Sequence, residues 1–207
     1  MASRGRFIVF EGGEGTGKST QAERLARHLG ALLTREPGGS ALGDAVRALF
    51  LGEAVGVISP RAELLLVAAA RAQHVVELIS PTLLAGRDVV CDRFSGSTLA
   101  YQGHGRGLPL EDVLVASELA TAGLQPDLTV LLDLDPAVAK ARRKSEADRI
   151  EAEGDAFHER VFAGFRAIAA ADPRGWALLD ASGSPDEVEG RVREVVTARL
   201  GPPAVPA

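Results

Sequence analysis

A glycine-rich run near the start of the chain has the spacing of a phosphate-binding loop. The pattern G-x-x-x-x-G-K-S is met by Gly12-Gly13-Glu14-Gly15-Thr16-Gly17-Lys18-Ser19. The glycines let successive backbone N–H groups point into one concavity, and the positive end of a following helix adds attraction for phosphate. Lys18 is expected to reach the β- and γ-phosphates of a nucleoside triphosphate, and Ser19 to bind Mg²⁺ through its hydroxyl group. Thr20 completes the predicted triphosphate site.

A second pair of chemical groups follows the short apolar run 89–91. Asp92 and Arg93 stand directly after this run, and ligands bind at the carboxyl ends of strands in open α/β sheets. An arginine fork can hold a phosphate with two hydrogen bonds, and a carboxylate can orient Mg²⁺ through water. A surface ion pair between neighbouring residues is the alternative.

Five short apolar runs are separated by helical stretches, and this alternation predicts an α/β fold with a five-stranded parallel sheet between helices. The expected strands are Phe7 to Phe10, Ala31 to Thr34, Asp88 to Cys91, Leu128 to Asp133 and Trp176 to Asp180. A helix is expected to begin near Lys18 and to end at Gly30. Ser59 and Pro60 predict the start of a long helix, which should kink at Pro81 or end before Gly86.

Further helices are expected in the second half of the chain. They cover Glu111 to Ala122, Ala137 to about Ala171 with a charged interruption at Arg142 to Gly154, and about Asp186 to Leu200.

Composition narrows the possible functions. The chain has 207 residues, which suits one α/β domain, and its net charge of −5 argues against a general nucleic-acid or membrane-surface binder. One cysteine, Cys91, cannot form an internal disulfide, and no charged leader or long apolar stretch opens the chain. A cytoplasmic protein is therefore expected. The sequence contains no asparagine, so the Asn-Lys-x-Asp run that reads guanine in small GTPases is absent.

Several motifs, in this order, make nearly the whole chain resemble the bacterial thymidylate kinases, which are P-loop nucleoside-monophosphate kinases. They are Phe10-Glu11-Gly12, Thr34-Arg35-Glu36-Pro37-Gly38-Gly39, Ala70-Arg71-Ala72-Gln73, Asp92-Arg93-Phe94, Ala100-Tyr101-Gln102-Gly103 and Asp148-Arg149-Ile150-Glu151. The resemblance implies the fold of that family, ATP and Mg²⁺ as cofactors, thymidine monophosphate as phosphoryl acceptor, and a homodimer.

The same resemblance implies residues for the acceptor site. Glu36, Arg47 and Arg93 would hold the monophosphate and its surroundings, and Arg71 would hydrogen-bond the pyrimidine base. Base and sugar would be enclosed by Ser97, Thr98, Tyr101 and Gln102. For Tyr101 a place in the apolar core is the alternative, whereas Gln102 is expected in a polar loop.

Two positions depart from the family pattern. Val67 stands where the family generally has a phenylalanine that stacks on thymine, and Ala70 stands where an acidic residue is common. Glu14 occupies a position where some members carry an arginine. It is expected close to the transferred phosphoryl group, where it would orient Mg²⁺, water or the sugar 3′-hydroxyl. The alternative is a carboxylate that is stabilised at the helix N-terminus by the helix dipole.

The charged segment at about 142–154 resembles the lid that closes over ATP in this family and supplies a catalytic arginine. Arg149 is the first candidate for this role and Arg143 the second, since the transition state needs cations against its equatorial oxygens. A solvated helical face remains the alternative.

The sequence thus predicts one kinase domain at residues 1–201, followed by a disordered tail at 202–207. Two other functions stay open: a related nucleotide kinase with another acceptor, and a P-loop regulator that binds nucleotide without catalysis.

Overall fold

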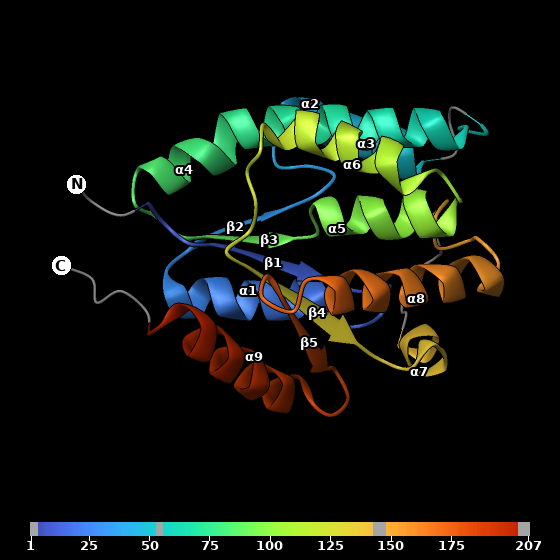
Figure 1. Cartoon of the computed structure of the whole chain (residues 1–207). Helices are drawn as coiled ribbons and strands as arrows, with labels where there is room; N and C mark the ends of the chain where they lie inside the picture. Colours follow the sequence, from blue (N-terminus) through green and yellow to red (C-terminus); the bar gives the residue numbers. More distant parts are fainter. Residues whose placement is uncertain (1–3, 53–55, 143–147, 203–207) are drawn as a thin grey trace.

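A central sheet of five parallel strands lies between two layers of helices (Figure 1). The computed structural model describes residues 4–52, 56–142 and 148–202. The strand order is β2-β3-β1-β4-β5. The strands are β1 Phe7–Glu11, β2 Leu32–Arg35, β3 Val89–Asp92, β4 Leu128–Asp133 and β5 Trp176–Asp180. The predicted α/β class with its five-stranded parallel sheet is confirmed.

The central strand β1 is buried along its whole length, because both faces of the sheet are covered. Ile8 and Phe10 belong to one core cluster, with residues of helices α1 (Lys18–Leu29) and α9 (Pro185–Leu200). Phe7 and Val9 belong to another cluster on the opposite face. Phe10 pairs with Asp92 in the register of β1 and β3. This pairing brings the glycine-rich loop and the Asp92–Arg93 pair to the same edge of the sheet.

Helices α1 and α9 cover one face of the sheet, and α3, α4, α5 and α6 lie on the other (Figure 1). The α-helices are α1 Lys18–Leu29, α2 Ala41–Leu51, α3 Pro60–His74, α4 Ser80–Leu84, α5 Ser95–Thr98, α6 Leu110–Thr121, α7 Pro136–Ala141, α8 Asp155–Ala171 and α9 Pro185–Leu200. Two π-helical segments are η1 Val75–Ile79 and η2 Leu99–Gly105. The helices predicted from the sequence all occur, with ends within one or two residues of those expected.

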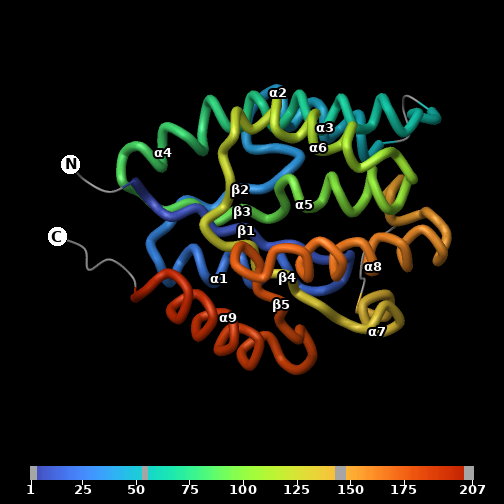
Figure 2. The backbone as a smooth tube through the Cα atoms, in the orientation of Figure 1, coloured from blue at the N-terminus to red at the C-terminus, as the bar shows by residue number. Residues whose placement is uncertain are grey.

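The long helix predicted from Ser59 and Pro60 runs through α3, η1 and α4 as one continuous course (Figure 2). Ser59 caps it by accepting a hydrogen bond from the backbone N–H of Ala62. The helix ends at Leu84, before Gly86, as expected. Pro81 is accommodated because the wider π turn precedes it and places it in the first turn of α4.

One local prediction was wrong. Gln102 was expected in a polar loop, but it lies in η2 and is only 2% exposed. Segment 95–105 is helical and packs closely against α8, where a Cβ atom on Gly105 would come within 2.7 Å of the Phe157 ring. The predicted tail falls mostly at 203–207, outside the described residues.

Candidate active site

The loop between β1 and α1 is shaped for close approach to phosphate. Gly15 has a φ of 80°, and a Cβ atom there would come within 2.1 Å of the Ala139 carbonyl oxygen. Gly17, with a φ of 90°, caps the N-terminus of α1. The backbone N–H groups of this helix start are therefore available for an anion.

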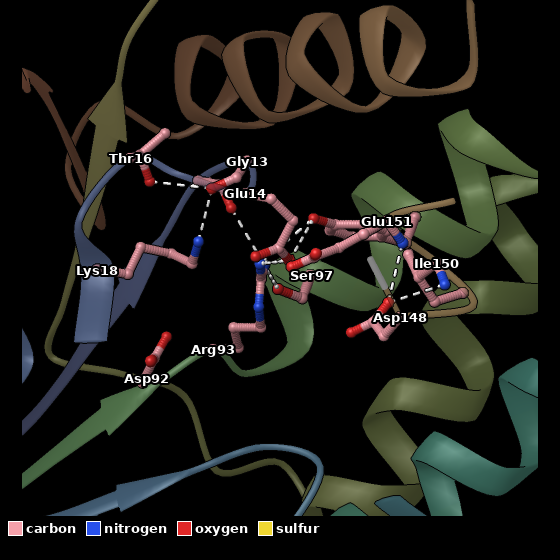
Figure 3. A network of polar contacts seen from close by, with 12 residues as sticks. Gly13, Glu14, Thr16, Lys18, Asp92, Arg93, Ser97, Asp148, Ile150 and Glu151 are labelled. Atoms are coloured by element: carbon pink, nitrogen blue, oxygen red, sulfur yellow. Dashed lines mark hydrogen bonds and ion pairs between the residues drawn. The ribbon is translucent and has the colours of Figure 1, made fainter. Parts of the chain in front are cut away.

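Lys18 lies folded against this loop and is 5% exposed. Its Nζ donates a hydrogen bond of 2.6 Å to the Gly13 carbonyl oxygen, and Thr16 donates to the same oxygen (Figure 3). Burial and then the nearby Arg93 cation lower the pKa of Lys18. Thr20, in contrast, is an exposed residue of α1.

Ser19 and Asp92 form a contact that suits a magnesium ion. The Ser19 hydroxyl donates a hydrogen bond of 2.5 Å to Asp92 Oδ2, while Asp92 Oδ1 is buried without a hydrogen-bond partner. A hydroxyl and a carboxylate oxygen beside a phosphate site are the protein ligands that Mg²⁺ usually accepts, with phosphates and water completing its shell. These two residues fit the ion.

Arg93 is the centre of a polar cluster at the carboxyl end of β3. Its guanidinium donates to the Gly12 carbonyl oxygen at 3.1 Å and to Ser97 Oγ at 3.0 Å, and it pairs with Glu14 (Figure 3). Burial is the largest single effect and acts to lower the pKa of Arg93, but the charges of Glu14, Tyr101, Asp92 and Glu11 together outweigh it, so the pKa is raised. Arg93 therefore carries a permanent charge beside the phosphate loop.

Tyr101 lies both in the apolar core and at the expected acceptor site, the two alternatives that the sequence left open. Its ring packs in the core against Phe157 and Phe165, while its hydroxyl lies within 3.2 Å of Glu14 and 3.3 Å of Arg93. Burial raises the pKa of the Tyr101 hydroxyl. The phenol is thus a neutral group at the edge of the site.

A buried cluster of charged and polar groups supports the acceptor side. Arg71 Nε donates to Glu36 Oε2 at 2.7 Å, and Arg71 Nη2 donates to the Phe94 carbonyl oxygen at 3.0 Å. Glu36 Oε1 contacts His74 Nδ1 at 3.0 Å, and His74 Nε2 contacts Thr34 at 2.8 Å. Arg71 Nη1 is buried and has no protein partner, so one guanidinium N–H group is left for a ligand.

Arg47 reaches the same region from α2. It donates a hydrogen bond of 3.1 Å to the Pro37 carbonyl oxygen. Burial, followed by repulsion from Arg35 and Arg93, lowers the pKa of Arg47. Arg35 and Arg93 lie close enough to Arg47 to repel it, and this local positive charge favours an anionic ligand.

One cleft joins these groups and contains about 980 Å³ of atom-free space, including the part open to solvent. The cleft gathers apolar side chains and a few charged and polar groups, as sites for small-molecule ligands do. The residues predicted from the sequence that line it are Glu14, Lys18, Ser19, Glu36, Arg47, Val67, Arg71, Asp92, Arg93, Ser97, Thr98, Tyr101 and Gln102. The apolar part of the wall includes Phe50, Leu51 and Ile150 beside Val67.

Of the two predicted lid arginines, the structure describes only Arg149, whose hydrogen-bond partners lie away from the phosphate loop. Arg143 lies outside the described residues. Arg149 Nη1 pairs with Glu63 at 2.7 Å, and Arg149 Nε donates to the Phe50 carbonyl oxygen at 2.8 Å. Arg149 Nη2 is buried without a hydrogen-bond partner, and the transition-state role expected of Arg149 stays a prediction.

Sequence reasoning assigned no role to Glu11, Glu63 or His74, which are all 0% exposed. Glu11 accepts hydrogen bonds from the backbone N–H groups of Phe94 and Ser97, at 3.0 and 2.8 Å, and burial raises its pKa. A carboxylate that ends the apolar run Phe7–Phe10 was the available signal for Glu11. Glu63 and His74 stand in a helix, where their burial depends on distant partners.

Comparison with known proteins gives a consistent family. The thymidylate kinase family model matches residues 10–192. A thymidylate kinase of a Synechococcus species is 54% identical over 200 residues, covering 94% of this chain and 95% of the relative. The thymidylate kinase of Solidesulfovibrio magneticus is 50% identical over 204 residues, covering 92% and 98%.

Solved structures agree with this result. The crystal structure of thymidylate kinase from Ehrlichia chaffeensis matches with a TM-score of 0.79 at 32% identity, covering 93% of this chain and 99% of that one.

Proposed function

The chain belongs to the thymidylate kinase family, and we propose how its cleft transfers the γ-phosphoryl group of ATP to thymidine monophosphate. The enzyme is an ATP:thymidylate phosphotransferase, which forms thymidine diphosphate and ADP. The observation that carries the proposed site is the single cleft shared by Lys18, Arg93 and Arg71. The proposed triphosphate loop and the proposed acceptor pocket both line this cleft, which supports direct transfer between them.

The donor side is the loop that begins at Gly12 together with the first residues of α1, as far as Thr20. Its backbone N–H groups and Lys18 hold the phosphates of ATP. Lys18 must exchange its bond to the Gly13 carbonyl oxygen for the phosphates, so ATP replaces a contact already present. Mg²⁺, held by Ser19 and Asp92, would neutralise charge on the phosphates when bound.

The acceptor side is formed by the arginines and by the polar residues of α5 and η2. Arg93 and Arg47 meet the monophosphate, with Glu36 fixing its surroundings, and the free Nη1 of Arg71 meets the base. Base and sugar are enclosed by Val67, Ser97, Thr98, Tyr101 and Gln102.

Phosphoryl transfer requires alignment and positive charge more than covalent help from the protein. Arg93 supplies fixed charge between the two sides, and Glu14 keeps its guanidinium in place. The acceptor oxygen is already anionic and needs no strong base. Arg149 and Arg143 remain the sequence-based candidates for an added cation in the transition state.

The specificity of the acceptor side is tested by comparing thymidylate, uridylate, cytidylate, guanylate and adenylate as acceptors at equal concentration. We expect thymidylate to give the highest kcat/KM. A higher value for another monophosphate would favour a related nucleotide kinase. No turnover of any monophosphate, with nucleotide binding retained, would favour a P-loop regulator.

We further propose a single kinase domain over residues 1–201 that acts in the cytoplasm without nucleic-acid partners and forms a homodimer. Within the described residues, no helix is long and apolar enough to cross a membrane. Apolar side chains of α3 and α6, two adjacent helices in Figure 1, are exposed: Leu65, Leu114, Val115 and Leu119. Such a surface suits pairing with a second copy, and sedimentation velocity with and without Leu119→Glu tests it.

A further inference from the structure

Glu63 is a buried carboxylate that has no place in the mechanism described above. It lies in the first turn of α3 and is 0% exposed, and it does not line the cleft. A carboxylate in such a position is tolerated only when it is paired and hydrogen-bonded.

Two arginines from different parts of the chain supply that pairing. Arg106 reaches both carboxylate oxygens of Glu63, with Nε donating at 3.0 Å and Nη2 at 2.9 Å. Arg149 Nη1 donates to Oε1 at 2.7 Å, and Gln102 Nε2 donates to Oε2 at 3.4 Å. One carboxylate thus joins α3, η2 and the segment that contains Arg149.

The two arginines also hold the segment Asp148–Glu153 in position. Arg149 donates to the Phe50 carbonyl oxygen and stacks over the Phe50 ring, with 5.1 Å from Cζ to the ring centroid. Arg106 Nη1 pairs with Glu153 at 2.5 Å. The segment is therefore held at Arg149 and at Glu153. Glu63 takes part in both contacts, because it pairs with Arg149 directly and with Glu153 through Arg106.

The same segment forms one wall of the cleft. Asp148, Ile150 and Glu151 line the cleft, and Asp148 Oδ1 accepts hydrogen bonds of 2.9 Å from the N–H groups of Ile150 and Glu151 (Figure 3). Ile150 belongs to the apolar cluster that contains Val67 and Phe50. The position of this wall therefore depends on the ion pairs of Glu63 with Arg149 and with Arg106.

We infer that Glu63 is a positioning residue for the acceptor pocket: through Arg106 and Arg149 it holds segment 148–153 against the cleft. The inference rests on the proposed assignment of this cleft to thymidylate. Because Glu63 contacts neither the phosphate loop nor the Arg93 cluster in any described hydrogen bond, its effect should concern the acceptor and leave the ATP side unchanged.

The first test replaces the charge at nearly constant size. Glu63→Gln leaves two guanidinium groups without their common anion. We expect the KM for thymidylate to rise about tenfold, with kcat within about twofold and the KM for ATP unchanged. Glu194→Gln, an exposed position of α9, is the matched control and should change none of these values. A lower melting temperature with an unchanged KM for thymidylate would reduce Glu63 to a structural residue and overturn the inference.

The second test uses non-additivity, and it also serves if Glu63→Gln alone folds poorly. Arg149→Met and Arg106→Lys should each raise the KM for thymidylate. The double variant Glu63→Gln/Arg149→Met should have a KM for thymidylate no higher than that of Glu63→Gln, because both substitutions remove the same Glu63–Arg149 ion pair. Effects that multiply independently, or single arginine variants with unchanged KM, would contradict the inference.

The failure of the inference can be distinguished from a failure of the proposed function. If the wild-type enzyme shows no thymidylate saturation, the proposed acceptor assignment is wrong and the inference falls with it. If the wild-type enzyme saturates with thymidylate and Glu63→Gln has the same KM, only the inference is wrong.

Discussion

Ser19 donates a hydrogen bond of 2.5 Å to Asp92, and this contact joins the phosphate loop to the carboxyl end of β3. It exists because β1 and β3 are neighbours in register, with Phe10 opposite Asp92. Two motifs that are far apart in the sequence therefore form one site.

Lys18→Ala should lower kcat by about a hundredfold or more, since the loss of one group that stabilises developing charge has effects of this size. Among the residues that the structure describes, Lys18 is the only lysine that lines the cleft. The measurement is steady-state kinetics at saturating ATP, with a thermal melt to show that the variant is folded. A rate close to that of the wild type would show that the loop assignment is wrong.

Ser19→Ala should instead raise the Mg²⁺ concentration needed for half-maximal rate, because Asp92 would then hold the ion without the hydroxyl ligand. Titration of Mg²⁺ at fixed ATP checks this result. An unchanged Mg²⁺ requirement would exclude Ser19 from the metal site.

ATP binding should take up protons at alkaline pH. The pKa of Lys18 is lowered by burial and by Arg93, so part of the free enzyme carries a neutral lysine below the ordinary value of 10.5. Bound phosphates favour the charged form and raise the pKa again. ATP affinity should therefore fall as pH rises through the pKa of the free enzyme.

Calorimetry of ATP binding at about pH 9, in two buffers of different ionisation enthalpy, measures this proton uptake. Lys18→Met is the control and should abolish the part of the uptake that belongs to the lysine. Equal uptake in the wild type and in Lys18→Met would contradict the assignment.

Arg149→Ala separates two roles in one experiment. The sequence predicts a transition-state arginine, whose loss would lower kcat far more than it weakens thymidylate binding. The ion pair with Glu63 indicates a positioning role, so we expect the KM for thymidylate to rise with a smaller change in kcat. Arg93→Ala should change both constants. A large loss of kcat with an unchanged KM for Arg149→Ala would favour the transition-state role.

Val67→Phe should lower the KM for thymidylate by about two- to tenfold, since an aromatic contact contributes about 0.5–1.5 kcal/mol beyond its area. Val67 lines the cleft, and Phe50 lies in the same apolar cluster. The change in kcat should be small. An unchanged KM in a folded variant would indicate that Phe50 or Tyr101 already covers the base.

The strands and the phosphate loop were predictable because their signals are local. Apolar runs such as Leu128–Asp133 are buried on both faces, and the spacing of Gly12, Gly17 and Lys18 is set by one turn and one helix start. Segment 95–105 was not predictable as a helix, because its glycines have low helix propensity. They are required by close contacts with residues distant in the sequence, such as that of Gly105 with Phe157.

The ion pairs that support the site were also invisible in the sequence. Glu63 and Arg149 are 86 residues apart, and Glu63 stands at a helical position that would suit an exposed residue equally well. Only the packing of α3 against η2 and segment 148–153 shows that this carboxylate is buried. The same holds for His74, which is buried by its contacts with Glu36 and Thr34.

The central claim is that one cleft brings ATP and thymidylate together for direct transfer. The most direct measurement follows ADP release from the purified enzyme with ATP and Mg²⁺, first without any monophosphate and then with thymidylate added. We expect almost no ADP before the addition and a saturable rate after it, with one thymidine diphosphate formed for each ADP. ADP release that does not depend on thymidylate or any other monophosphate would contradict the account.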